Sequence, residues 1–569
     1  MRKIANSKIL DIEKVFDWAV KENYSDLLDF ENKKSNIKYI KFFSKENKIR
    51  NYNYCKKFAN QALGKFLSNL NKYHETNFSK KYWEIIVYQW YILNLNLIYD
   101  YWILSDLLIK NKIYKIYNID NQLLEYEKTV DCNSQSKHYH YWILSEIIKY
   151  KRKFQYIEKK YVIKTNQNKK KKFSIVDNLF KYLMKFVLIF SSPKIFIRDL
   201  GIKKKYILLL NLRLKQFPSI WIEPHYKSNK INVEKREKYF YKKKKIKNFN
   251  NFLNSIIYKT IPKSFLEDFD NINLSVKSFW PKNVKTILTA GFRQSDIFRI
   301  WIANMKRKRS KIYMFQHGGF IGMSMFHDGE ESESYLVDKF FTWGFKNNKK
   351  NLFPLFSLGL STKKINKNLN GKENKIIFCI SSNTKYLCQV PGFFPRNNIQ
   401  RIKKIFIIKQ TLAKLKKEIK EKVIIRYDHK SYSRNKILIN KKLFGEEFIF
   451  DNCATQLTNH LNNTRLVVHD CCSTGWLETI FFNIPTVIIL DKKVEVFRKG
   501  FNKNLNELIK CKVIHYSHDS LIEFINNNYH EIDNWWNSNL VKKSIHSLQK
   551  EYIKGSNDPI NDLIKTLRK

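Results

Sequence analysis

Short apolar runs alternate with stretches of helical periodicity over much of the chain beyond residue 285. The apolar runs are KTILTAG (285–291), KIYMFQHGG (311–319), KIIFCIS (375–381), KVIIRYDH (422–429), FIFD (448–451), RLVVHD (465–470) and TVIIL (486–490). Helical patterns separate most of them, as in residues 295–308, 399–420 and 476–483. Strands that alternate with helices predict parallel sheets covered by helices on both faces. The expected fold class is therefore α/β, with two Rossmann-like domains.

The pattern before residue 190 is different. Residues 75–190 read mostly as helices, with long apolar-periodic stretches and few breakers. Two further runs, KIFIRDL (194–200) and YILLLNLRL (206–214), look like strands, and another strand is expected near residues 37–43. We therefore predict a helix-rich insertion, at about residues 70–190, inside the first domain.

The length of the chain and one polar loop suggest where the domains divide. A chain of 569 residues exceeds what one hydrophobic core usually organises. The Asn- and Lys-rich loop at about 347–372 is the expected boundary. We predict a first domain over 1–350, a second domain over 370–530, and a C-terminal helical tail over 531–569.

The most apolar stretch, Trp83–Leu108, is expected to be a buried helix. It contains Glu84, Gln89, Asp100 and Asp106, which are costly inside a bilayer. The N-terminal apolar run is also interrupted by charged residues, so it does not resemble a signal peptide. None of the eight cysteines forms a CxxC pair or a zinc spacing, which fits reduced thiols. We expect a cytoplasmic protein, with a peripheral position at the inner face of the cytoplasmic membrane as an alternative.

The charge of the chain is strongly positive. It has 106 Lys and Arg residues against 51 Asp and Glu residues, a net charge of +55. Gly and Pro are scarce, with 15 and 10 residues, and the lysines are spread along the chain, which favours an AT-rich genome as the cause. Attraction to an anionic membrane or lipid-linked acceptor is the second explanation, with the Lys-rich segment 227–247 as the expected contact. Nucleic-acid binding is the third.

The segment RLVVHDCCSTGWLETIFFNIPTVIIL (465–490) is the strongest candidate for ligand binding. A buried strand ends at Asp470, and the loop CCST then opens a helix with Ser473 or Thr474 at its N-cap and Glu478 in its first turns. A helix N-terminus offers free N–H groups and a positive dipole end to an anion. The alternative is a plain capped helix.

A second candidate lies at the end of the strand KVIIRYDH. Arg426 and His429 are expected near the carboxyl end of that strand, where ligands bind in doubly wound sheets. Arginine suits bidentate phosphate binding. The alternative is a surface histidine with a solvated arginine.

The third candidate is MFQHGGFIGMSMFHDGEESES (314–334). A strand places His317 directly before Gly318 and Gly319, where the backbone can approach a ligand closely. Histidine can act as an acid or base near neutral pH. The following acidic cluster could also supply the base that an inverting transfer needs, from Asp328, Glu330 or Glu331. The alternatives are a structural histidine and a solvated acidic loop.

Two other patterns favour structure over chemistry. His74 precedes a helix with an aromatic stripe, which is more often core than a ligand platform. Asp268-Phe269-Asp270 follows a helix-like segment and not an apolar strand, so we treat this Asp-x-Asp pair as a chance match. We expect no metal and no cofactor. The chain also lacks a GxxxxGK[ST] loop and a GxGxxG after a strand, so ATPase and dehydrogenase functions have no support.

Several motifs together resemble one family. They are NKYH…SKKYWEIIVYQW (71–90), QHGGFIG (316–322), TWG (342–344), RYDH (426–429), CCSTGWLET (471–479) and NWW (534–536). Their types and order resemble the largely uncharacterised LIC-type transferases of bacterial surface-polysaccharide and lipopolysaccharide gene clusters, over residues 70–560. The 465–490 segment is also similar to the donor half of GT-B glycosyltransferases. This resemblance implies phosphate contacts from Ser473 and Thr474 and ribose or phosphate positioning by Glu478.

The resemblance has departures. Sialyltransferase-like and Kdo-transferase-like enzymes often show His-Pro where this chain has His429-Lys430, and family members tend to have Pro at the position of Asp428. Polar residues often stand where this chain has Cys471 and Cys472.

These observations predict a metal-independent, GT-B-like glycosyltransferase. The expected donor is a nucleotide sugar, with a CMP-activated acidic sugar as first candidate, and the acceptor is a surface glycan or a lipid-linked glycan. The resemblance implies that residues 370–530 form the nucleotide-sugar-binding domain and residues 1–350 the acceptor domain. A non-catalytic membrane-surface scaffold of polysaccharide assembly is the second hypothesis. A basic nucleic-acid-binding protein is the third, and it predicts binding that weakens steeply with salt.

Overall fold

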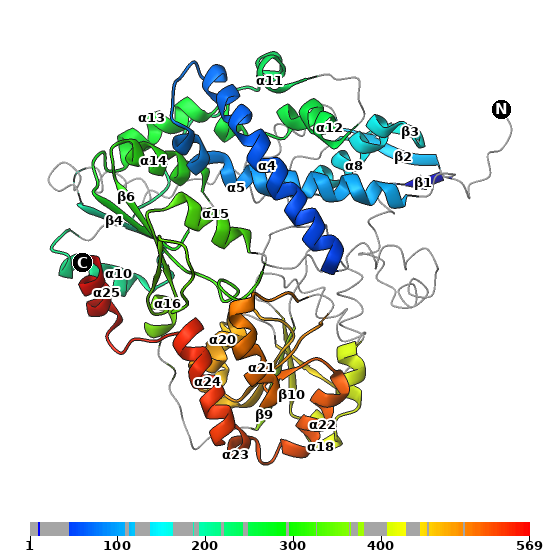
Figure 1. Cartoon of the computed structure of the whole chain (residues 1–569), viewed down its shortest axis with the longest axis vertical. Helices are drawn as coiled ribbons and strands as arrows, with labels where there is room; N and C mark the ends of the chain where they lie inside the picture. The colour runs from blue at the N-terminus through cyan, green and yellow to red at the C-terminus, as the bar shows by residue number, and fades with distance from the viewer. Residues whose placement is uncertain are drawn as a thin grey trace.

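The computed structural model describes most of the chain as a layered α/β molecule. The described residues are 9–11, 45–108, 113–119, 137–162, 186, 193–217, 221–242, 248–291, 295–325, 327–363, 365, 374–380, 407–427, 444–445, 447–451, 455–492 and 495–568. Figure 1 shows two α/β halves, one above the other, with long helices covering the first half. His429 and the expected strand at 37–43 lie outside the described residues.

The second half contains a six-stranded parallel sheet. Its strands are β9 (Lys375–Ile380), β10 (Val423–Tyr427), β11 (Ile449–Phe450), β12 (Thr464–His469), β13 (Thr486–Ile489) and β14 (Ile514–His515). They lie in the order β11-β10-β9-β12-β13-β14, all parallel. This is the doubly wound Rossmann order, in which the direction of winding reverses between β9 and β12. The helices of this half include α18 (Lys417–Lys420), α20 (Thr474–Phe481), α21 (Asn502–Lys510) and α22 (His518–Asn528).

The first half contains a five-stranded parallel sheet. Its strands, in spatial order, are β4 (Ile195–Arg198), β5 (Thr286–Thr289), β6 (Lys311–Phe315), β7 (Lys339–Thr342) and β8 (Leu352–Pro354). The connecting helices include α14 (Asp296–Arg307), capped by the Ser295 side chain, and α15 (Asp328–Leu336). The expected α/β class with two parallel sheets is confirmed. The described strands of this half follow one another in chain order, without the reversal seen in the second half.

Helices and a small sheet cover the first half. The helices are α4 (Lys45–Tyr73), α5 (Lys80–Leu104), α8 (Lys137–Lys151), α11 (Val233–Phe240), α12 (Phe249–Ile256) and α13 (Phe269–Phe279). A three-stranded parallel sheet joins β1 (Ile9–Asp11), β2 (Ile113–Asn118) and β3 (Gln155–Lys160). The helix-rich character was predicted, whereas strands β2 and β3 within it were not.

Helix α5 confirms the expected buried helix. It carries the apolar stretch from Trp83, and most of its residues are buried on all sides, including Glu84, Gln89 and Asp100. No helix in the described part of the chain combines the length and apolar character that crossing a bilayer requires. The aromatic residues of α5 therefore belong to the core.

One strand prediction was wrong, because residues 206–214 fold as a helix. They lie in α10 (Lys204–Arg213), which follows β4 after a turn at Gly201 with φ +70°. Only Leu210 and Asn211 of this helix are fully buried. The periodicity of a short run of leucines does not distinguish a strand from a helix. In the structure, the run is a helix that packs against the protein on one side.

The C-terminal tail crosses back from the second half to the first. It contains α23 (Ile532–Asn537), α24 (Asn539–Tyr552) and α25 (Pro559–Arg568). Ile560, Leu563 and Ile564 of α25 join the same core cluster as Leu210 of α10, and Figure 1 shows the two helices together. In the forward direction, the halves are joined through α16 (Leu358–Ser361) and the segment that follows it.

The NWW motif has a structural role in this tail. The Trp536 Nε1–H donates to Asn483 Oδ1 at 2.8 Å. Asn483 has φ +54° and follows the end of α20, where a left-handed residue commonly terminates a helix. This hydrogen bond ties the tail to the end of the candidate ligand-binding helix.

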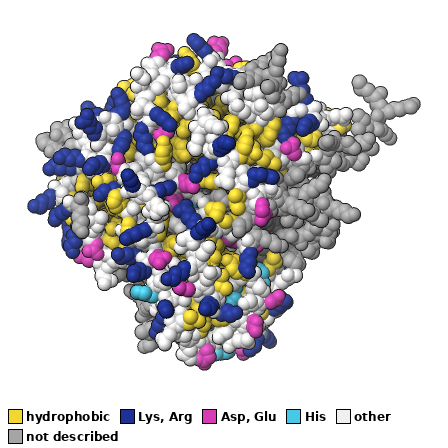
Figure 2. All heavy atoms as spheres, viewed as in Figure 1, with side chains coloured by type: hydrophobic (Ala, Val, Ile, Leu, Met, Phe, Trp, Pro, Cys, Tyr) yellow, Lys and Arg dark blue, Asp and Glu magenta, His cyan; other side chains and the backbone are white. Residues whose placement is uncertain are grey.

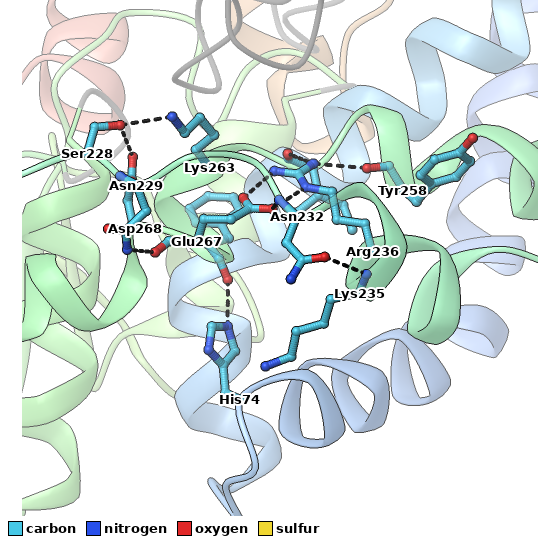
Figure 3. Close-up of polar contacts among 12 residues, drawn as sticks. His74, Ser228, Asn229, Asn232, Lys235, Arg236, Tyr258, Lys263, Glu267 and Asp268 are labelled. Atoms are coloured by element: carbon cyan, nitrogen blue, oxygen red, sulfur yellow. Dashed lines mark hydrogen bonds and ion pairs between the residues drawn. The ribbon is translucent and has the colours of Figure 1, made fainter. Parts of the chain in front are cut away.

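A buried polar network stabilises the helical layer of the first half (Figure 3). The Arg236 guanidinium donates to both carboxylate oxygens of Glu267, at 2.7 and 2.6 Å, and to the carbonyls of Tyr258 and Ile261. Burial alone would raise the pKa of Glu267, but the hydrogen bonds and charge of Arg236 hold that pKa below its usual value. The Arg236 N–H groups that burial removes from water therefore find hydrogen-bond acceptors within the protein.

The same network explains His74 and the Asp-x-Asp pair. His74 Nε2 lies 2.9 Å from the carbonyl oxygen of Phe265 (Figure 3). The His74 ring also stacks on that of Trp83. Asp268 accepts hydrogen bonds from Ser228 Oγ at 2.9 Å and from the Asn229 N–H at 2.7 Å. Both residues therefore hold the helical layer together, as the structural interpretations predicted.

The substitution Glu267→Gln tests the weight of this network. It leaves the Arg236 charge buried without its counter-charge, so we expect a loss of about 3–5 kcal/mol in the free energy of unfolding. Urea denaturation followed by circular dichroism measures the change. The matched control Asp519→Asn breaks an exposed pair with Lys414 and should leave the midpoint unchanged. Equal midpoints for the two variants would contradict the stabilising role of the buried pair.

Candidate active site

Two of the predicted loops meet between the halves. The Gly319 N–H, after β6, donates to Thr474 Oγ1 in the first turn of α20 at 3.1 Å. A Cβ on Gly319 would lie 3.0 Å from Thr474 Cα and 3.0 Å from Leu477 Cδ1. The sequence predicted a close backbone approach to a ligand at Gly318 and Gly319. The structure shows a close approach at Gly319, and its partner is the other half of the protein.

A second contact holds the same loop from the other side. Ser324 and Phe497 form an antiparallel bridge. The Met325 N–H donates to the Val496 carbonyl and the Arg498 N–H to the Met323 carbonyl, both at 2.9 Å. The segment after β13 thereby fixes the chain that runs from β6 to α15.

Glu330, one of the predicted bases, forms an ion pair between the halves. Its side chain is buried, with Oε1 at 2.5 Å from Arg498 Nη1 and Oε2 at 2.9 Å from the Gly322 N–H. Both carboxylate oxygens are therefore occupied by partners within the protein. This placement favours a structural role and does not favour proton abstraction from an acceptor.

Glu331, the second predicted carboxylate, has partners that point to a role other than catalysis. Glu331 accepts from Tyr52 Oη at 2.7 Å and Lys56 Nζ at 2.8 Å, both on α4. Burial would raise the pKa of Glu331, but these two donors lower it below its usual value. Asp328 is the first residue of α15, and its side chain lies outside the described part.

His317 faces a carboxylate that the sequence analysis did not select. Its Nδ1 lies 3.9 Å from Glu333 Oε2, while 43% of the His317 side chain is exposed and only 1% of the Glu333 side chain. Gln89 Nε2 on α5 donates to the other Glu333 oxygen at 3.3 Å. A Cβ on Gly291, after β5, would lie about 4 Å from both side chains. A half-exposed imidazole backed by a buried carboxylate is an arrangement suited to a general base.

The spacing of the acidic run could have revealed Glu333. Glu330 and Glu333 are three residues apart, so a helix places them on one face, and both are fully buried. From sequence, the acidic run was expected to supply a base from Asp328, Glu330 or Glu331, with a solvated loop as the alternative. Glu333 was missed because its position on a helix is what brings it to the histidine.

In the second half, α20 follows β12, one of the two strands between which the winding of the chain reverses direction. A pocket at the carboxyl ends of β9, β12 and β13 is lined by Phe378, Cys379, Ile380, Ile408, Thr411, Val468, His469, Asp470, Ile489, His518 and Leu521. In doubly wound sheets ligands bind in this position. Helix α20 starts after β12 at the same edge, and Ser473 at its N-cap makes no capping hydrogen bond with its side chain. Ser473 and Thr474 are partly exposed.

His469, the last residue of β12, packs against the first turn of α20. It is fully buried, and burial lowers its pKa to about 3, so the ring is neutral at physiological pH. A Cβ on Gly475 would lie 3.3 Å from His469 Cε1, which explains the glycine at the start of this helix. The helix N-terminus can therefore sit directly above the end of β12.

Arg426 and Glu478 are not brought together with these groups. Arg426 forms a buried ion pair with Asp451 and also bonds the Thr455 carbonyl, on the far side of β9 from β12. Glu478 forms an ion pair with Lys363 from the segment that joins the halves. Neither placement favours the predicted phosphate or ribose contact. Within the described ranges, no group of three or more His, Cys, Asp and Glu side chains is arranged to hold a metal ion.

Fold and site together define a two-domain α/β protein with a candidate active site between its halves. A model of the LIC12162 family transferases matches residues 9–567. The chain belongs to this family, and it is a transferase. No curated protein matches.

Several solved structures are distantly similar to this chain. A predicted UDP-N-acetylglucosamine 2-epimerase from Listeria monocytogenes is 9% identical, with a TM-score of 0.37 over 66% of this chain and 95% of its own. A mutant O-GlcNAc transferase from Thermobaculum terrenum is 10% identical, with a TM-score of 0.30 over 53% and 55%. WaaG, a glycosyltransferase involved in lipopolysaccharide biosynthesis, is 13% identical, with a TM-score of 0.26 over 51% and 82%. Values this low leave the function to be inferred from the site.

Two neighbouring glycines provide a matched test of the contact between the halves. Gly319→Ala places a methyl group against backbone atoms of α20, so we expect a loss of about 1–3 kcal/mol of stability. The methyl group of Gly318→Ala would lie 3.9 Å from Thr474 Oγ1, an ordinary van der Waals contact, so this substitution should have little effect. Thermal denaturation of both variants measures the difference. Equal melting temperatures would show that the loop does not pack on α20 in solution.

Proposed function

We propose that this transferase moves a sugar from a nucleotide sugar to an acceptor hydroxyl, with His317 as the general base. The observation that carries the proposal is the position of the His317–Glu333 pair. His317 directly precedes the two glycines, the second of which contacts the first turn of α20. His317 from one half and the N-terminus of α20 from the other therefore lie at one junction, which supports the proposal.

The donor is proposed to bind the second half. The pocket at the ends of β9 and β12 lies at the position where doubly wound sheets take nucleotides. The N-terminus of α20 would receive the phosphate, because its first N–H groups and its dipole favour an anion. Ser473 and Thr474 would add hydroxyl contacts, as the sequence suggested.

In the proposed step, His317 Nε2 accepts the proton of the acceptor hydroxyl while Nδ1–H faces Glu333. The acceptor oxygen forms a bond to the anomeric carbon, and the bond from that carbon to the donor phosphate oxygen breaks. The nucleotide leaves with the bonding electron pair, and the N-terminus of α20 stabilises its negative charge. A base on the acceptor hydroxyl is what a direct displacement with inversion uses. The 3.9 Å separation from Glu333 would shorten as the imidazole becomes charged.

The finer assignment concerns the substrates. A CMP-activated acidic sugar is the first donor to test, because of the resemblance to sialic-acid and Kdo transferases. A growing surface glycan or lipid-linked glycan is the proposed acceptor, in lipopolysaccharide or surface-polysaccharide biosynthesis. The membership of the transferase family supports the reaction class, and the substrates follow only from the resemblance.

Binding and chemistry can be tested separately. A panel of sugar nucleotides in a thermal-shift assay should contain one that raises the melting temperature, since a ligand of the folded state stabilises it. Ser473→Ala combined with Thr474→Ala should abolish that shift. If no nucleotide stabilises the protein, the donor site is wrong.

Substituting the histidine tests the base. His317→Ala should lower kcat for transfer by roughly 100- to 10,000-fold, because general base catalysis contributes about that much. It should keep the thermal shift with the donor nucleotide, since the phosphate site is on α20. Glu333→Gln should also lower kcat, by a smaller factor.

The matched control is His530→Ala, which removes an exposed histidine between α22 and α23. It should leave both kcat and the nucleotide shift unchanged. A His317→Ala enzyme with the rate of the unsubstituted protein would refute the proposed base.

A further inference from the structure

Helix α10 exposes a row of leucines to solvent. Leu208, Leu209 and Leu212 have 39%, 36% and 61% of their surface exposed, and Phe217 just beyond the helix has 55%. At 100° per residue, the three leucines fall within one side of the helix. Large exposed apolar residues that gather on one surface mark an interaction site more often than single ones do.

The opposite side of α10 is already packed. Leu210 joins the core cluster that includes Leu563 and Ile564 of α25, and partly buried Tyr206 and Ile207 pack against that cluster. The helix is thus held in place without its exposed leucines. The exposed surface of these leucines makes no contribution to the core cluster that holds α10 in place.

Basic residues surround this apolar row. Lys203, Lys204 and Lys205 lie at the start of α10, and Arg213 and Lys215 lie at its end, all of them exposed. Figure 2 shows many Lys and Arg side chains, with apolar ones between them, along the flank where Figure 1 places α10 and α25. An exposed apolar row with positive charge at both ends is the pattern of a helix that lies on an anionic bilayer.

We propose that α10 docks the protein on an anionic membrane surface, with the leucines in the headgroup boundary and the basic residues on lipid phosphates. Charge decides against a second copy of this chain as the occupant. The chain carries a net charge of +55, and two copies of this surface would bring like charges together around the leucines. The Lys-rich segment at 227–247, favoured from sequence, exposes Tyr241 as its one large apolar residue in the described part.

The position of α10 suits an acceptor held in a membrane. The helix follows the carboxyl end of β4, and Gly291 and His317 follow the carboxyl ends of β5 and β6 in the same parallel sheet. The docking helix and the candidate base therefore both follow carboxyl ends of strands in this sheet. Docking by α10 goes beyond the proposed transfer and does not depend on it.

Vesicle flotation with the purified full-length protein tests the docking. The protein should float with vesicles of 70% phosphatidylcholine and 30% phosphatidylglycerol and stay in solution with pure phosphatidylcholine. Combined Leu208→Ser, Leu209→Ser and Leu212→Ser should weaken binding at least about tenfold, because membrane affinity scales with inserted apolar area. The control Leu274→Ser, Ile449→Ser and Leu540→Ser removes three exposed apolar residues elsewhere and should bind as the unsubstituted protein does.

A second pair of variants tests the charge. Combined Lys203→Gln, Lys204→Gln and Lys205→Gln should weaken vesicle binding at least about tenfold, since each basic residue near an anionic surface adds affinity. Removing the same charge with Lys416→Gln, Lys417→Gln and Lys422→Gln, around α18, should have little effect. Equal losses for both triples would mean that net charge binds lipid, which would overturn the role of α10.

Two other results would also overturn the proposal. One is a protein that does not float with either vesicle. The other is a dimer in size-exclusion chromatography that the leucine variant dissociates while vesicle binding stays the same. Unchanged thermal melting of every variant confirms that each is folded, and transfer activity enters none of these readouts.

Discussion

The contact between Gly319 and the first turn of α20 is the constraint on which the candidate site depends. Each half alone carries an incomplete set of groups, a histidine in one and a helix N-terminus in the other. The hydrogen bond from the Gly319 N–H to Thr474 Oγ1 and the Glu330–Arg498 ion pair hold these groups at one junction. A buried ion pair contributes little net stability against an apolar equivalent, but removing one partner is costly, so the pair specifies this arrangement more than it strengthens it.

Helix α15 distributes its carboxylates among three neighbours. Glu330 reaches the second half, Glu331 reaches α4, and Glu333 faces His317 while bonding α5. A single short helix therefore connects the helical layer, the second half and the histidine.

Most strands of both halves could be predicted, because parallel strands buried on two faces leave continuous apolar runs. Strands β7, β8 and β14 were not predicted, and β8 lies in the segment that was expected to be a loop. The run at 206–214 was misassigned, since leucines exposed to solvent read in sequence like leucines of a core. The importance of Gly318-Gly319 was also predictable, although the approaching partner was not. Arg426 shows the limit for polar residues: sequence gives the chemistry of the side chain, whereas its partner Asp451 lies 25 residues away and occupies it.

The most direct measurement is a crystal structure of the protein with the nucleotide that stabilises it most. The nucleotide phosphate is expected at the N-terminus of α20, within hydrogen-bond distance of Ser473 or Thr474. The nucleobase should lie toward the pocket at β9 and β12, and the leaving phosphate should face His317. A nucleotide bound elsewhere, or one whose phosphate points away from the junction of the two halves, would contradict the site described here.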